Sequence, residues 1–114
     1  MRARWCALTT PQSAWPWYNI GMISDFQKRI WENKLNRGFN TTDVNQEFCL
    51  LYGEVAEAYD AWNKKKDDIG GELADVAIYL YGLSEMLGLD LEQEIKNKMA
   101  INEKRIYKNG VKLS

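Results

Sequence analysis

The sequence predicts an all-α domain built as an antiparallel bundle of four helices. Four stretches carry apolar residues at the 3.6-residue spacing of amphipathic helices, and short polar or glycine-containing loops separate them. No stretch of useful length alternates like a strand, and no internal repeat is present. A chain of 114 residues has room for one hydrophobic core. We therefore expect one helical domain over residues 22–108 and a short tail over residues 109–114.

Residues 1–21 differ from the rest of the chain. They contain Trp5, Trp15 and Trp17, two prolines and no acidic residue, and they show no sustained periodicity. The basic start at Arg2 is not followed by the unbroken apolar run of a signal peptide. Two interpretations remain open: an accessory arm that docks through its tryptophans, or a disordered tail.

The first helix is predicted from Ser24 to the Arg37-Gly38 pair. Ser24 followed by Gln27 three residues later forms a capping box, in which the serine caps the helix and the glutamine reaches back. Glycine is the usual residue just beyond a helix end. The apolar stripe of this helix begins with Phe26, Ile30 and Trp31.

The second and third helices are predicted on either side of a polar loop, residues 63–68. Thr41, Thr42 and Asp43 are all capping residues, and the second helix runs from them to about Trp62. The third helix runs from near Ile69 to Leu87, with Gly88 in the C′ position.

Asp90 and Gln93 form another capping box, and the fourth helix is predicted to end near Tyr107, before Asn109-Gly110. Its expected core stripe consists of Ile95, Met99 and Ile106.

Asn102 falls on the same line as this stripe. Lys98, Asn102 and Arg105 lie within about 60° of one another and form a polar face of two cations and an amide. Arginine binds phosphate oxygens bidentately and lysine binds them as a point charge. A solvated face explains Lys98 and Arg105 equally well, but explains the position of Asn102 less well.

Two pairs of acids occupy helix faces where apolar residues are expected. Glu54 and Glu57 on the second helix, and Glu72 and Asp75 on the third, each have i, i+3 spacing. Counting about 100° per residue places Glu72 and Asp75 inside an apolar arc and the other pair along the edge of one. Buried carboxylates are costly unless a cation binds them, and Mg²⁺ prefers oxygen ligands. We therefore expect a magnesium site, with the second pair the more buried and the first pair facing the substrate.

Composition excludes several classes of protein. A net charge of −1 gives no general attraction to nucleic acid or to acidic membranes, and no apolar run is long enough to span a bilayer. The absence of histidine excludes Ser-His and Cys-His catalytic triads and HExxH zinc sites. Cys6 and Cys49 are far apart and are expected to be ordinary cytoplasmic thiols.

At these residues the chain resembles the MazG-like branch of the all-α nucleoside triphosphate pyrophosphohydrolases. That family has an ExxE pair, then an ExxD pair, and then commonly a Lys-x-x-x-Asn-x-x-Arg pattern. Here these are Glu54-Val-Ala-Glu57, Glu72-Leu-Ala-Asp75 and Lys98-Met-Ala-Ile-Asn102-Glu-Lys-Arg105, within a resemblance that spans about Ser24 to Tyr107. Many relatives have an extra glutamate before the first pair, where this chain has Gly53.

The resemblance implies Mg²⁺-dependent hydrolysis of a nucleoside triphosphate to a monophosphate and pyrophosphate, with Mn²⁺ as a possible substitute, in nucleotide house-cleaning. It implies metal ligation by the four acids, with Glu57 also acting on the attacking water, and a homo-oligomer, either a dimer or a tetramer. Lys98, Asn102 and Arg105 would bind the substrate, and Trp31 would stack on its base unless it is an ordinary core residue. The alternative is a non-enzymatic helical adaptor with a structural cation site.

Overall fold

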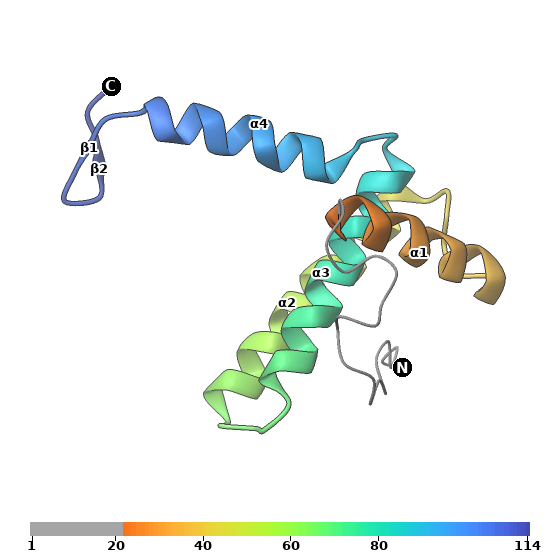
Figure 1. Cartoon of the computed structure of the whole chain (residues 1–114). Helices are drawn as coiled ribbons and strands as arrows, with labels where there is room; N and C mark the ends of the chain where they lie inside the picture. Colours follow the sequence, from red (N-terminus) through yellow and green to blue (C-terminus); the bar gives the residue numbers. More distant parts are fainter. Residues whose placement is uncertain (1–21) are drawn as a thin grey trace.

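The structure, a computed structural model, describes residues 22–114, with side-chain detail from residue 25 onward. The predicted N-terminal arm, residues 1–21, lies outside the described residues, and so does the side chain of Ser24. The described residues form four helices and a small hairpin (Figure 1). In chain order these are α1 (Met22–Arg37), α2 (Val44–Asn63), α3 (Ile69–Met86), α4 (Leu91–Lys104), β1 (Tyr107–Lys108) and β2 (Val111–Lys112).

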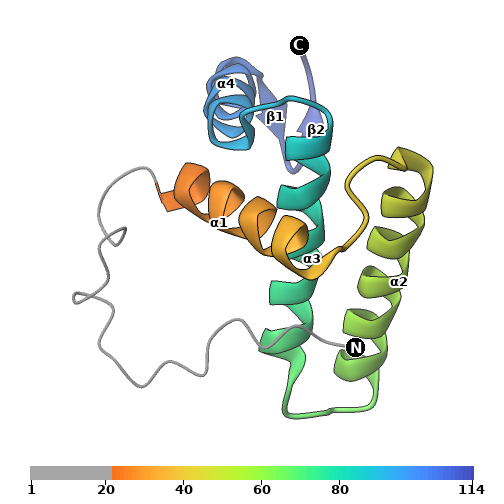
Figure 2. The same cartoon turned by 90° about the vertical axis from the view of Figure 1, so that its right-hand side faces the viewer.

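The all-α prediction is confirmed, and α2 and α3 are its centre. These two helices form an antiparallel hairpin, and α1 packs across α3 (Figures 1 and 2). Helix α4 instead runs away from the α2–α3 hairpin and contacts α1 near the corner where it begins. Within the described residues, no helix is both long and apolar enough to cross a bilayer.

The cap of α2 shows how a short sequence signal fixes a helix start. Asp43 is the N-cap, and its Oδ1 accepts a hydrogen bond from the Gln46 amide at 3.0 Å. Asn40 orients this cap because its Oδ1 accepts from the Asp43 amide at 3.0 Å. Of the three predicted capping residues, Asp43 is therefore the one that caps.

A buried ion pair joins α1 to α2. Lys34 Nζ lies 2.7 Å from Glu47 Oε2, and the two side chains are only 8% and 1% exposed. Asn40 Nδ2 donates to the other Glu47 oxygen at 3.2 Å. Gly82 of α3 makes room for the pair, since a Cβ there would lie 3.1 Å from Lys34 Cδ. The sequence analysis missed this pair because its partners are on different helices.

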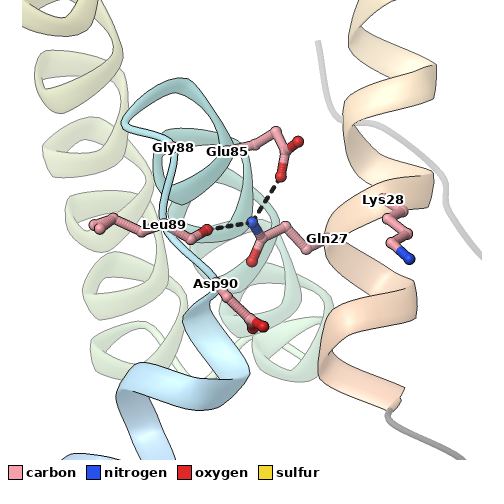
Figure 3. Close-up of a pocket in the computed structure, with 6 residues that line it drawn as sticks. All are labelled: Gln27, Lys28, Glu85, Gly88, Leu89 and Asp90. Carbon is pink, nitrogen blue, oxygen red and sulfur yellow. Dashed lines mark hydrogen bonds between the residues drawn. The ribbon is translucent and has the colours of Figure 1, made fainter.

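The capping-box role predicted for Gln27 is wrong. Helix α1 begins at Met22, before Ser24, and the Gln27 side chain points toward Glu85 and Leu89 (Figure 3). Its Nε2 donates to Glu85 Oε2 and to the Leu89 carbonyl, both at 2.7 Å. Its Oε1 accepts from the Leu91 amide at 3.1 Å. Gln27 thus ties α1 to the corner between α3 and α4, a tertiary role that local spacing does not encode.

The end of the chain also differs from the prediction. Helix α4 stops at Lys104, and none of its residues is buried. The prediction that Met99 and Ile106 belong to a core stripe is therefore wrong, because both side chains are exposed in the single chain. Asn109 and Gly110 have φ values of 51° and 79° and connect β1 to the antiparallel β2. These positive angles suit the Asn-Gly turns of tight hairpins. The Asn-Gly pair therefore marks a hairpin turn within the predicted tail.

Candidate metal centre

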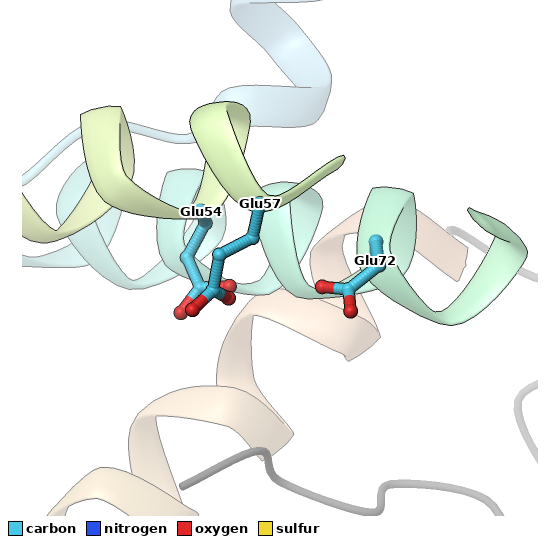
Figure 4. A group of neighbouring side chains, drawn as sticks. All are labelled: Glu54, Glu57 and Glu72. Carbon is cyan, nitrogen blue, oxygen red and sulfur yellow. The ribbon is translucent and has the colours of Figure 1, made fainter. Parts of the chain in front are cut away.

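Three of the four predicted ligands come together between α2 and α3. Glu54 and Glu57 of α2 and Glu72 of α3 each offer a carboxylate oxygen, and these oxygens lie within 4.8 Å of one another (Figure 4). The i, i+3 spacing places both α2 acids on one side of that helix. Because α3 runs antiparallel beside α2, its first turn brings Glu72 to the same place.

Burial divides the acids as their helical angles predict. Glu72 is 1% exposed and Asp75 is 7% exposed, whereas Glu54 is half-buried and Glu57 is exposed. The expectation that the ExxD pair is the more buried is confirmed. The cluster therefore has a closed side on α3 and an open side at Glu57.

The electrostatics of the cluster favour a cation. The pKa of Glu54 is raised from its ordinary value of 4.5 to about 7. Burial is the largest cause, followed by a hydrogen bond shared with Glu57 and by repulsion from Glu57, Asp75 and Glu72. Glu54 Oε2 is buried and has no hydrogen-bond partner among the described residues. A divalent cation would offset the repulsion between the carboxylates and would bind Glu54 Oε2. The set of oxygen donors therefore fits Mg²⁺.

Tyr79 borders the cluster and was missed by the sequence analysis. Burial raises the pKa of its phenol, and the nearby charges of Glu54, Glu47, Asp75 and Glu57 raise it further. The phenol therefore stays protonated at neutral pH and adds no negative charge to the cluster. Its spacing four residues after Asp75, one helical turn, is the signal that could have found it.

The predicted substrate-binding face of α4 is not joined to the carboxylates within one chain. Helix α4 leaves the α2–α3 hairpin at the corner opposite to the turn that precedes Glu72 (Figure 1). Lys98 and Asn102 are exposed, and Arg105 Nη1 donates to Asn102 Oδ1 at 3.1 Å. Trp31 is half-buried on α1. The roles predicted for these four residues stay predictions.

Comparison with known protein families identifies the family to which the chain belongs. The profile of the MazG-like family matches residues 49–112, which is more than half of the chain and contains both acidic pairs and α4. The chain belongs to the MazG-like family. The match begins at residue 49, within α2, so both partners of the buried ion pair, Lys34 and Glu47, lie outside it.

This MazG-like chain is also similar to a protein named dATP/dGTP diphosphohydrolase from Salmonella phage PMBT28. The two are 36% identical over 90 residues, which cover 79% of this chain and 29% of the phage protein. The chain therefore spans less than a third of that relative's length. No solved structure matches the chain significantly.

The raised pKa of Glu54 predicts how the stability of the metal-free MazG-like chain depends on pH. Folded Glu54 keeps its proton up to about pH 7, whereas the unfolded chain releases it near 4.5. Between these values the folded state binds more protons, so the free energy of unfolding should decrease as pH rises. We expect the melting temperature without metal to fall between about pH 5 and pH 8, with a smaller fall in Glu54→Gln.

Thermal melts with and without Mg²⁺ check this prediction. Mg²⁺ should raise the melting temperature most at the high end of the range, where Glu54 is ionised. Glu103→Gln, which changes an exposed acid of α4, is the matched control and should keep the wild-type slope. An unchanged slope in Glu54→Gln would contradict the assignment.

Proposed function

We propose that this chain hydrolyses nucleoside triphosphates, including deoxynucleoside triphosphates, to a monophosphate and pyrophosphate. The observation that carries the proposal is the group of three carboxylates within 4.8 Å, formed by two facing helices of a MazG-like chain. The name of the phage relative, dATP/dGTP diphosphohydrolase, supports a purine deoxynucleotide among the substrates.

We assign Glu54, Glu57, Glu72 and Asp75 to binding Mg²⁺, for which Mn²⁺ can substitute. When bound, the ion would supply Lewis-acid stabilisation of charge on the phosphate oxygens and would acidify a water. The buried pair, Glu72 and Asp75, holds the closed side of the site in place. We also assign Glu57 to orienting the attacking water and accepting its proton, an assignment that its exposure supports.

We assign Lys98, Asn102 and Arg105 to the phosphates and Trp31 to the base. Because one chain keeps α4 away from the carboxylates, this assignment requires a homo-oligomer, a dimer or a tetramer, in which α4 of one copy reaches the carboxylates of another. The proposed role is cytoplasmic house-cleaning of the nucleotide pool.

A substrate panel tests the reaction. The protein is incubated with Mg²⁺ and ordinary or modified nucleoside triphosphates, and pyrophosphate, monophosphate and inorganic phosphate are measured separately. We expect equal amounts of monophosphate and pyrophosphate, and loss of both when EDTA removes the metal. The Glu103→Gln control should retain full activity.

Two results would redirect the proposal. Release of inorganic phosphate would keep the metal site but change the reaction class. No turnover of any substrate at micromolar enzyme would favour the adaptor alternative, in which the acids form a structural cation site.

A further inference from the structure

Helix α4 is held to the rest of the described chain only near its start. Leu91, Glu92 and Ile95 are half-buried, and every other residue of α4 is exposed. Among the described helices, α4 packs mainly against α1, and it extends away from the α2–α3 hairpin (Figure 1). The direction of α4 therefore depends on how its first turn is fixed at the corner that joins it to α3.

The Gln27 side chain connects three segments at this corner (Figure 3). Its Nε2 donates to Glu85 Oε2 of α3 and to the Leu89 carbonyl, both at 2.7 Å, and its Oε1 accepts from the Leu91 amide at 3.1 Å. We call these four residues the corner network. Gln27 is only 5% exposed, and both ends of its amide are bonded. A buried amide that is bonded at both ends favours one relative position of the segments that it joins.

The corner network binds backbone groups that helices leave without a partner. Leu91 is the first residue of α4, and the first amides of a helix have no carbonyl of the same helix to bond. Leu89 is bonded on both sides, because its amide donates to the Ser84 carbonyl at 2.9 Å while its carbonyl accepts from Gln27. The start of α4 is thereby fixed to α1 and to α3 at once.

Hydrogen bonds contribute more than apolar packing to holding this corner. A pocket of about 310 Å³ lies beside the corner network, and it is lined by Gln27, Lys28, Glu85, Gly88, Leu89 and Asp90. Leu89 is the one large apolar residue among them, and it is 44% exposed. Segments with few buried apolar contacts move readily. Loss of the Gln27 bonds would therefore leave little to keep α4 in one direction.

A small rotation at the corner becomes a large displacement at the far end of α4. At a rise of about 1.5 Å per residue, Lys98 lies about 10 Å and Arg105 about 21 Å along the helix from Leu91. A rotation of about 10° at Leu91 would move these two residues by about 2 and 4 Å. Groups that bind a substrate need to be held within about 0.5 Å of their productive positions.

We propose that Gln27 is a positioning residue for the nucleotide. It acts by fixing the direction of α4, and with it the positions of Lys98, Asn102 and Arg105. This inference rests on the proposed function, in which these three residues bind the phosphates. Gln27 itself has no contact with the substrate in this role.

Spin labels on the full chain measure the direction of α4 without using activity. In a Cys6→Ser, Cys49→Ser background, labels are attached at Lys104→Cys and Gln46→Cys, which are exposed positions on α4 and α2. Labelled protein is diluted with unlabelled protein, so that only distances within one chain are measured. Gln27→Met keeps the length of the side chain but removes its hydrogen bonds, and it should broaden the distance distribution at least about twofold.

Exchange of two polar partners tests the contact itself. Gln27→Glu alone brings two carboxylates together at Glu85 and should broaden the distribution as much as Gln27→Met does. Adding Glu85→Gln restores a donor opposite the new carboxylate, so the double variant should recover part of the wild-type width. Lys28→Met is the matched control, because Lys28 is an exposed neighbour on α1 outside the corner network, and it should keep the wild-type width. Circular dichroism checks that each variant is folded.

Steady-state kinetics connect the corner network to the substrate. Gln27→Met should raise the KM for the nucleoside triphosphate at least about tenfold and change kcat by less than about threefold, because the carboxylates of α2 and α3 are unchanged. In an Arg105→Ala background the same substitution should raise KM less, since one of the contacts that it positions is already absent. A merely structural role would reduce the amount of folded enzyme, and hence kcat, without changing KM.

Three outcomes would overturn the proposal. An unchanged distance distribution in Gln27→Met would show that the corner network does not hold α4. A broadened distribution with an unchanged KM would show that the direction of α4 does not position the phosphate-binding residues. If the wild type turns over no nucleoside triphosphate, the proposed function fails and the positioning role fails with it, while the label distances report separately whether Gln27 holds α4.

Discussion

Glu72→Gln should reduce nucleotide hydrolysis at least about a hundredfold and leave the helical fold intact. Glu72 is almost fully buried beside Glu54 and Glu57, so the substitution removes a charged ligand from the closed side of the cluster without changing its size. Asp75→Asn should act in the same way, because Asp75 is also buried and its charge acts on Glu54. Pyrophosphate release under saturating Mg²⁺ measures the loss.

The same variants should lose activity but should not lose stability when no metal is bound. Removing a like charge from the cluster should raise or maintain the melting temperature of the metal-free protein, and the pKa of Glu54 should move back toward 4.5. The stabilisation by Mg²⁺ should become smaller in both variants. If both unfold and the wild type binds no Mg²⁺, the acids have a structural role and the metal assignment is wrong.

Lys34→Met should lower the free energy of unfolding by about 3–5 kcal/mol, the largest stability effect that we expect from one substitution. The change leaves the Glu47 carboxylate 1% exposed without its 2.7 Å ionic partner. Because the cost comes from the unpaired charge, the double variant Lys34→Met, Glu47→Leu should recover most of the loss. Urea unfolding followed by circular dichroism provides the four free energies of this double-mutant cycle.

Lys64→Met is the matched control for this cycle. Lys64 pairs with Asp60 at 3.0 Å, but the two side chains are 62% and 43% exposed. Exposed pairs of this kind contribute at most about 1 kcal/mol. Equal effects of Lys34→Met and Lys64→Met would show that the α1–α2 pair is not buried in solution.

Most of the helix boundaries could be predicted because their signals are local. Asp43 and Asp90 accept hydrogen bonds from amides three residues later, at 3.0 and 3.2 Å, as their predicted capping roles require. Gly88 follows the end of α3 with a φ of 69°. A cap needs only the residues of one helical turn, so the sequence contains all the information that fixes it.

The order of burial in the metal centre could also be predicted, because it depends on the angle of each acid around its own helix. Glu72 and Asp75 lie within an apolar arc, and they are the buried pair. The meeting of Glu54 with Glu72 was expected when both pairs were assigned to one magnesium site, but the angles around each helix could not establish it, since their contact depends on the register between α2 and α3.

The errors share one physical cause, which is that burial depends on which helices pack together. Met99 and Ile106 have the spacing of a core stripe, but α4 leaves the bundle and both side chains are exposed. Gln27 has the spacing of a capping box, but its amide finds three partners at the α3–α4 corner. Periodicity identifies an apolar face and does not identify what covers it.

By itself, the sequence determined four helices, most of their ends and the pairs of acids that share a helix face, because these features depend on residues within a few turns of one another. Only the tertiary structure decided that Lys34 neutralises Glu47, that Gln27 holds the α3–α4 corner, and that Tyr79 borders the carboxylates. It also showed that no residue of α4 is buried and that Tyr52, Tyr59 and Trp62 of α2 stay exposed within the described chain. These features depend on contacts between helices, whose relative placement is set by the packing of the whole domain.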